Sequence, residues 1–139
     1  MIEAIRDFGQ SGATLLIGLA VGAAWIITIV SPNTSYDHLT GKQADSHVRE
    51  LLKAGSDPIA VILLVAGALA ILGGAMVAGI ASLLAAVGFF TNRWTLASFK
   101  GASKKEDGPQ KTQRILAVSL TLIFTLLAAA AGVMAVLGY

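Results

Sequence analysis

The chain has 139 residues, the length of one domain, of which 55% are hydrophobic and 13% are charged. That charged share is about half the share in soluble domains, and a net charge of +2 is too small to favour nucleic acid as a partner. The chain has no cysteine, which excludes disulfides, thiolate catalysis, iron–sulfur clusters and zinc–thiolate sites.

The few charges are segregated along the sequence. No charged residue occurs at 8–36, 58–92 or 115–139. A helix of a soluble protein has a polar face and an apolar face, and these runs have no such alternation. The pattern predicts an all-α integral membrane protein whose surface contacts the lipid bilayer.

The first apolar run predicts a membrane span at 11–30, which Ser31-Pro32-Asn33 is expected to end. The acidic residues before it and the length of the run favour a retained helix over a signal peptide. Gly18 and Gly22 form a small-xxx-small pair, which lets two helix backbones approach closely.

The stretch at 58–90 predicts two spans that form a hairpin. As one helix it would be ~50 Å long at roughly 1.5 Å per residue, whereas the hydrocarbon core of a bilayer is only ~30 Å thick. The break is expected between Gly73-Gly74 and Gly79, which gives spans at 58–73 and 75–96. Two rows of small residues are expected to face each other: Ala66, Ala70 and Gly74 on one helix, and Ala78, Ser82 and Ala86 on the other. Asn92, Arg93 and Trp94 are expected to mark the exit of the third span.

The segment at 42–54 predicts a short amphipathic helix in the first loop. Its apolar residues follow the i, i+4, i+7, i+8 spacing of one helix face, namely Ala44, Val48, Leu51 and Leu52. Gly55 is expected to end this helix, and Asp57-Pro58 to start the second span. We expect the helix to lie in the headgroup region, although a helix packed on the ends of the spans would give the same pattern.

A fourth span at 115–137 completes a bundle of four transmembrane helices. Nine basic residues then lie in the two loops on one side: Lys42, Arg49, Lys53, Arg93, Lys100, Lys104, Lys105, Lys111 and Arg114. Only Arg6 lies on the other side. The positive-inside rule therefore predicts both termini outside and both loops cytoplasmic, in a bacterial inner membrane. A three-span arrangement also satisfies the rule, with seven basic residues against three.

The sequence contains few residues that suggest ion transport, cofactor binding or metal binding. No ionisable residue lies deep within a span, which argues against an ion pump or a proton-coupled carrier. The two histidines, His38 and His47, fall outside the spans, so no haem or other cofactor is expected. The His and carboxylate residues of the first loop have no tight ligand spacing, so no metal site is expected; they are Asp37, His38, Asp45, His47 and Glu50.

One enzyme-like arrangement is conceivable at the cytoplasmic face. There Tyr36, His38, Arg93 and Trp94 would line a pocket between spans for an apolar ligand, with the amphipathic helix as its cover. No residue is assigned a catalytic role on this basis.

The order of these parts resembles two families of small four-span membrane proteins. Pro32 after the first span, LLKAGSDP at 51–58 and FFTNRW at 89–94 are similar to the anthrone-oxygenase-like family. Pro32 followed by Tyr36 is similar to the group typified by transmembrane protein 205. The first resemblance implies cofactor-free oxidation of an aromatic compound, and the second implies no known activity.

The sequence favours a non-catalytic membrane protein, an accessory or assembly subunit that packs against other membrane helices or a second copy. The alternative is a cofactor-free membrane enzyme or lipophile-binding protein. A third class, a pore-forming oligomer, needs a polar stripe along a channel, and the hydroxyl side chains do not form one.

Overall fold

The computed structural model describes residues 1–97 and 107–139, with the backbone alone at 93, 95–97 and 107–114. No strand occurs in these ranges. The elements are α1 (Ile2–Trp25), the π-helical turn η1 (Ile26–Val30), α2 (Ser31–His38), α3 (Gly41–Leu72), α4 (Met76–Ala97) and α5 (Asp107–Leu137).

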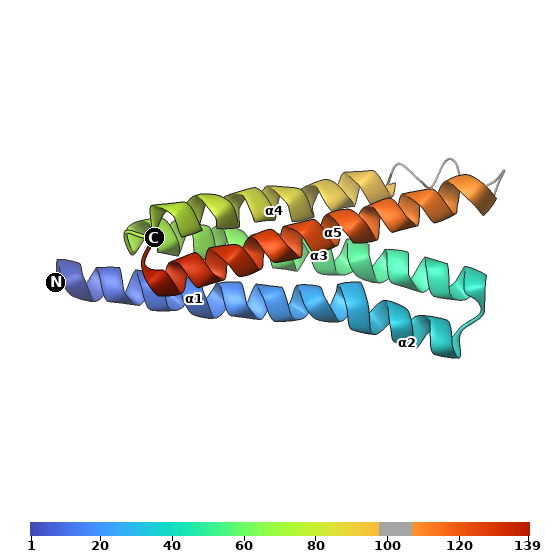
Figure 1. Ribbon diagram of the computed structural model, residues 1–139, viewed down its shortest axis with the longest axis horizontal. Coiled ribbons are helices and arrows are strands. Elements are labelled where there is room, and N and C mark those ends of the chain that lie inside the picture. Colours follow the sequence, from blue (N-terminus) through green and yellow to red (C-terminus); the bar gives the residue numbers. More distant parts are fainter. Residues whose placement is uncertain (98–106) are drawn as a thin grey trace.

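The helices run side by side in an elongated bundle (Figure 1). Helix α3 packs between α1 and α4, and α5 closes the ring by packing on α4 and α1. The N-terminus, the α3–α4 turn and the C-terminal end of α5 lie at one end, which we call the turn end. Helix α2, the start of α3, the end of α4 and the start of α5 lie at the other, the loop end.

Within the described residues, three helical segments are long and apolar enough to span a membrane, namely Ile2–His38, Gly41–Leu72 and Ile115–Leu137. Met76–Asn92 is a shorter apolar helix. The structure thus confirms an all-helical chain with the composition of a membrane-spanning bundle.

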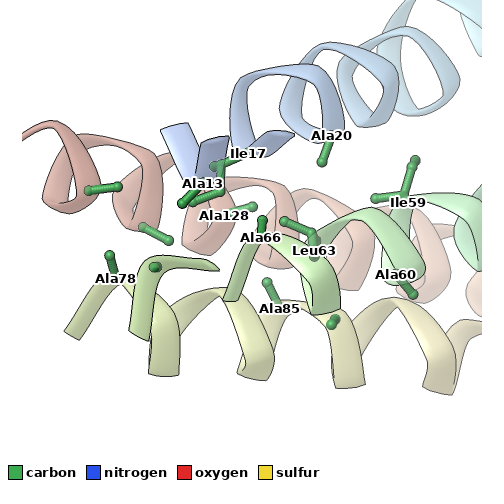
Figure 2. Close-up of a cluster of buried hydrophobic side chains, with 14 of the residues drawn as sticks. Ala13, Ile17, Ala20, Ile59, Ala60, Leu63, Ala66, Ala78, Ala85 and Ala128 are labelled. Carbon is green, nitrogen blue, oxygen red and sulfur yellow. The ribbon is translucent and has the colours of Figure 1, made fainter. Parts of the chain in front are cut away.

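The bundle interior is built from small side chains. Figure 2 shows Ala13, Ile17 and Ala20 of α1 near Ala128 of α5, with Ala66 and Leu63 of α3 between them and α4. Seventeen core residues form one cluster, and most of them are alanine. Because alanine takes up little space, the helix backbones approach closely.

The prediction that Pro32 ends the first helix is wrong. The helix continues to His38 through η1, in which the Ser31 N–H donates to the Ile26 carbonyl five residues earlier. This wider turn starts a new α-helical register, with Pro32 in the first turn of α2. Because Pro32 has no N–H, the Thr28 carbonyl lacks the donor that an α-helix would supply.

The predicted break at Gly55 to Pro58 is also wrong, because α3 is one helix of 32 residues with Pro58 inside it. The buried positions Leu52, Ser56, Ile59 and Leu63 follow one another at helical spacing across the proline. The apolar stripe of 42–54 and the row that contains Ala66 and Ala70 therefore lie on one face of α3. Pro58 and Ala54, whose carbonyl loses its helical donor, lie on the exposed side.

The α3–α4 turn lies at Gly73 and Gly74, within the range that the sequence indicates. Gly74 has φ +84°, a conformation that L side chains rarely adopt. Gly73 and Gly9 let α3 and α1 touch, since a Cβ on Gly9 would lie 2.7 Å from the Leu69 carbonyl oxygen and 2.8 Å from the Gly73 nitrogen. Arg6 Nε donates to the Gly73 carbonyl over 3.3 Å.

The contact at Gly9 predicts that alanine substitutions at two glycines of α1, Gly9 and Gly18, have different effects on stability. Gly9→Ala forces two backbones apart and should destabilise the purified protein by about 1–3 kcal/mol. Gly18→Ala is the matched control, because nothing lies within 4 Å of an added Cβ there. It should leave stability unchanged or raise it by up to about 1 kcal/mol. Thermal unfolding in detergent measures both, and equal effects would contradict the helix crossing described here.

Candidate functional site

The small residues of the α3–α4 hairpin lie inside the bundle. Ala66, Ala70, Ala78, Ser82 and Ala86 are all 0% exposed. Ser82 Oγ donates to the Leu63 carbonyl over 2.8 Å and so joins α4 to α3. Gly74, grouped with this row in the sequence, lies instead in the exposed turn.

Gly18 and Gly22 are placed differently. Both lie on the exposed side of α1, and a Cβ added at either would find no atom within 4 Å. Leu15, Leu19 and Ile26 on the same helix are 70%, 57% and 57% exposed. We call this surface the Gly18–Gly22 face. No other helix of the described chain covers the two glycines.

The apolar stripe of 42–54 packs on the bundle. Ala44, Val48 and Leu52 are at most 1% exposed, and Leu51 is half-buried. Val48 and Leu52 form a small core with Ala117 of α5, against which Ile27 of η1 packs. The stripe therefore contacts protein along its buried side, which is the second of the two arrangements that the sequence allows.

The four residues of the expected pocket are not brought together. Tyr36 and His38 lie on α2, whereas Trp94 lies near the end of α4, on the opposite side of the bundle (Figure 1). Trp94 is 70% exposed. Arg93 belongs to α4, and its side chain is outside the described part of the structure.

A different concavity occurs between α2 and α3. It is an open groove of about 350 Å³, which we call the histidine groove. Its lining residues are Ile26, Val30, Ser31, Thr34, Ser35, His38, Leu39 and His47. The volume is at the lower end of the ~300–1,000 Å³ typical of small-molecule sites.

Hydrogen bonds fix the tautomer of His47. Ser35 Oγ donates to the Ser31 carbonyl over 2.8 Å, which uses its one proton. At the 2.9 Å contact with Ser35 Oγ, the Nδ1 atom of His47 must therefore be the donor. In the neutral ring Nε2 then carries the lone pair, and His47 is one of the residues that line the groove.

The same interface has a second polar link. Tyr36 Oη donates to Asp45 Oδ1 over 2.5 Å; Tyr36 directly follows Ser35, and Asp45 lies two residues before His47. Together the two contacts hold α2 against α3 outside the apolar core. Within the described residues, no group of three or more His, Cys, Asp or Glu side chains is placed to hold a metal ion.

A buried polar layer near the loop end is not predicted from the sequence. Asn92 is 1% exposed and does not mark an exit from the bundle; its Nδ2 donates to Thr121 Oγ1 of α5 over 2.7 Å. Thr121 Oγ1 in turn donates to the Ala117 carbonyl, also over 2.7 Å. Ser56, Thr125 and Thr28 are buried as well, at 0%, 4% and 3% exposed. Helical spacing alone could have placed Asn92 on the face of Ala78, Ala85 and Phe89.

No family model matches the chain, and no curated protein or solved structure with which it was compared matches it either.

Proposed function

We propose that the chain is a small integral membrane protein that packs against other membrane helices, as an accessory or assembly subunit. The observation that carries this proposal is the Gly18–Gly22 face. Other glycines serve contacts within the bundle: a Cβ on Gly67 would lie 2.9 Å from Leu83 Cγ, and one on Gly88 would lie 2.3 Å from Phe124 Cδ1.

Glycine inside a helix costs roughly 0.5–1 kcal/mol relative to alanine. Two glycines four residues apart with no contact inside the chain therefore favour a partner helix outside it. In lipid, association between helices depends on close packing of this kind. The partner is another membrane subunit or a second copy of the chain.

Helix lengths support a membrane setting in which the loop end protrudes. The 32 residues of α3 rise ~48 Å, about 18 Å more than the ~30 Å hydrocarbon core. With the turn end at one membrane surface, α2 and the first turns of α3 extend beyond the other. Six basic residues lie in described helical segments toward this end: Lys42, Arg49, Lys53, Arg93, Lys111 and Arg114. We therefore place this end in the cytoplasm of a bacterial cell, with both termini outside.

A photo-crosslinking residue at Leu19 tests the partner proposal. In native membranes it should give a protein adduct of defined mass, because Leu19 flanks both glycines. Replacing Gly18 and Gly22 by isoleucine should lower the adduct yield ~10-fold, which corresponds to about 1.4 kcal/mol. The matched control is Ala68→Ile on the exposed side of α3. Adducts with lipid alone, or equal loss in the control, would contradict the proposal.

The histidine groove favours a second candidate, a binding site for a lipophilic molecule with a polar head. Its walls include Ile26, Val30 and Leu39, and His47 Nε2 offers an acceptor to a donor on the ligand. With α3 placed as above, the groove lies near the headgroup layer. An amphipathic ligand bound there would have the hydrocarbon core beside its apolar part and the headgroup layer beside its polar head.

Filling the groove tests this second candidate. Val30→Trp should reduce the lipophile retained by the purified protein, measured by native mass spectrometry, because Val30 lines the groove and is 47% exposed. Val61→Trp is the control, since Val61 is 51% exposed on α3 and does not line the groove. No retained lipophile, or the same retention in both variants, would rule out the site.

A further inference from the structure

One buried hydroxyl differs from the others. Ser35, Ser56, Ser82, Thr121 and Thr125 are buried, and each donates a hydrogen bond to a backbone carbonyl. Thr28 is 3% exposed, and its Oγ1 is covered but makes no hydrogen bond. A buried hydroxyl without a partner costs about 1–3 kcal/mol, so this position requires an explanation.

The backbone around Thr28 is unusual as well. In an α-helix the Ser31 N–H would bond to the Ile27 carbonyl, but in η1 it bonds to the carbonyl of Ile26. Pro32 has no N–H and cannot donate to the Thr28 carbonyl. Two successive carbonyls therefore lack the donor that an α-helix supplies, beside a hydroxyl that is itself unbonded.

Ile27 of η1 contacts residues that adjoin two members of the polar layer, Ser56 and Thr121. Ile27 contacts Gly55 of α3, where an added Cβ would lie 2.9 Å from Ile27 Cδ1. Ile27 also packs against Ala117, whose carbonyl accepts the Thr121 hydroxyl. Because Ile27 also packs against the alanine-rich cluster, η1 lies between that cluster and the small core of Val48, Leu52 and Ala117.

We propose that Thr28 and the carbonyls of η1 bind an internal water molecule. A buried water requires two to four polar partners and a polar site, and this turn offers the Thr28 hydroxyl as donor and two carbonyls as acceptors. The water would bond to the Thr28 hydroxyl and to the carbonyls of Ile27 and Thr28, which lack their α-helical donors. It would also make η1 a solvated turn inside the bundle.

Substitution by valine tests the water through stability. Thr28→Val keeps the shape of the side chain and removes the hydroxyl, so the water loses a partner. We expect its melting temperature to fall about 4 °C further than that of Thr125→Val. Thr125 is the matched control, because its hydroxyl bonds only to the Thr121 carbonyl of its own helix. Thr28→Ser, paired with Thr125→Ser, retains the hydroxyl and should show no such excess.

Solid-state NMR of the protein in deuterated lipid detects the water itself. Magnetisation transfer from water should reach Thr28 in the wild type and be lost in Thr28→Val. Ala13 and Ile17, which are 0% and 1% exposed in the dry core, are the internal reference. A wild-type Thr28 with no more water transfer than Ala13 would overturn the proposal. A Thr28→Val protein at least as stable as the wild type would also contradict it, because it would show that no water is bound to the Thr28 hydroxyl. If the two readouts disagree, the water transfer decides.

Discussion

The bundle depends on direct contact between helix backbones, and at the closest of these contacts only glycine fits. Gly9 meets Gly73 where α1 crosses α3, and a Cβ on Gly79 would lie 3.0 Å from the Gly67 carbonyl where α3 crosses α4. The core between these crossings is mostly alanine. Large apolar side chains consequently point outward, as in Leu15, Val87 and Leu126 at 70%, 58% and 68% exposed. Such a distribution suits a surface that contacts lipid.

The helices themselves could be predicted from the sequence, because long uncharged runs and a Gly-Gly turn are local signals. The effects of the two internal prolines could not. Pro32 and Pro58 each read as a helix boundary, yet both lie within continuous helical segments. In α3 the buried stripe continues in phase across Pro58, and packing along that stripe offsets one lost hydrogen bond. At Pro32 a π-helical turn supplies a new register, and no local rule of sequence indicates such a turn.

The two halves of the bundle differ in chemistry. Toward the turn end, alanine side chains and the contact between Gly9 and Gly73 form a close-packed interior. Toward the loop end lie the Asn92–Thr121 hydrogen bond, η1 and the histidine groove. The groove could not be predicted from spacing, since it needs α2 to continue past Pro32 and to lie on α3. His38 was among the residues singled out from the sequence, but its neighbour in the groove is His47 and not Trp94.

We propose that this bundle spans a membrane, with the turn end outside and the loop end inside. The chain has no cysteine, so single-cysteine variants report one position each. Glu3→Cys and Met76→Cys lie at the turn end, and Ser46→Cys lies at the loop end; all three positions are exposed. In intact cells an impermeant thiol reagent should label Glu3→Cys and Met76→Cys, and should label Ser46→Cys only after permeabilisation. Labelling of Ser46→Cys in intact cells, or opposite accessibility of Glu3→Cys and Met76→Cys, would contradict the account.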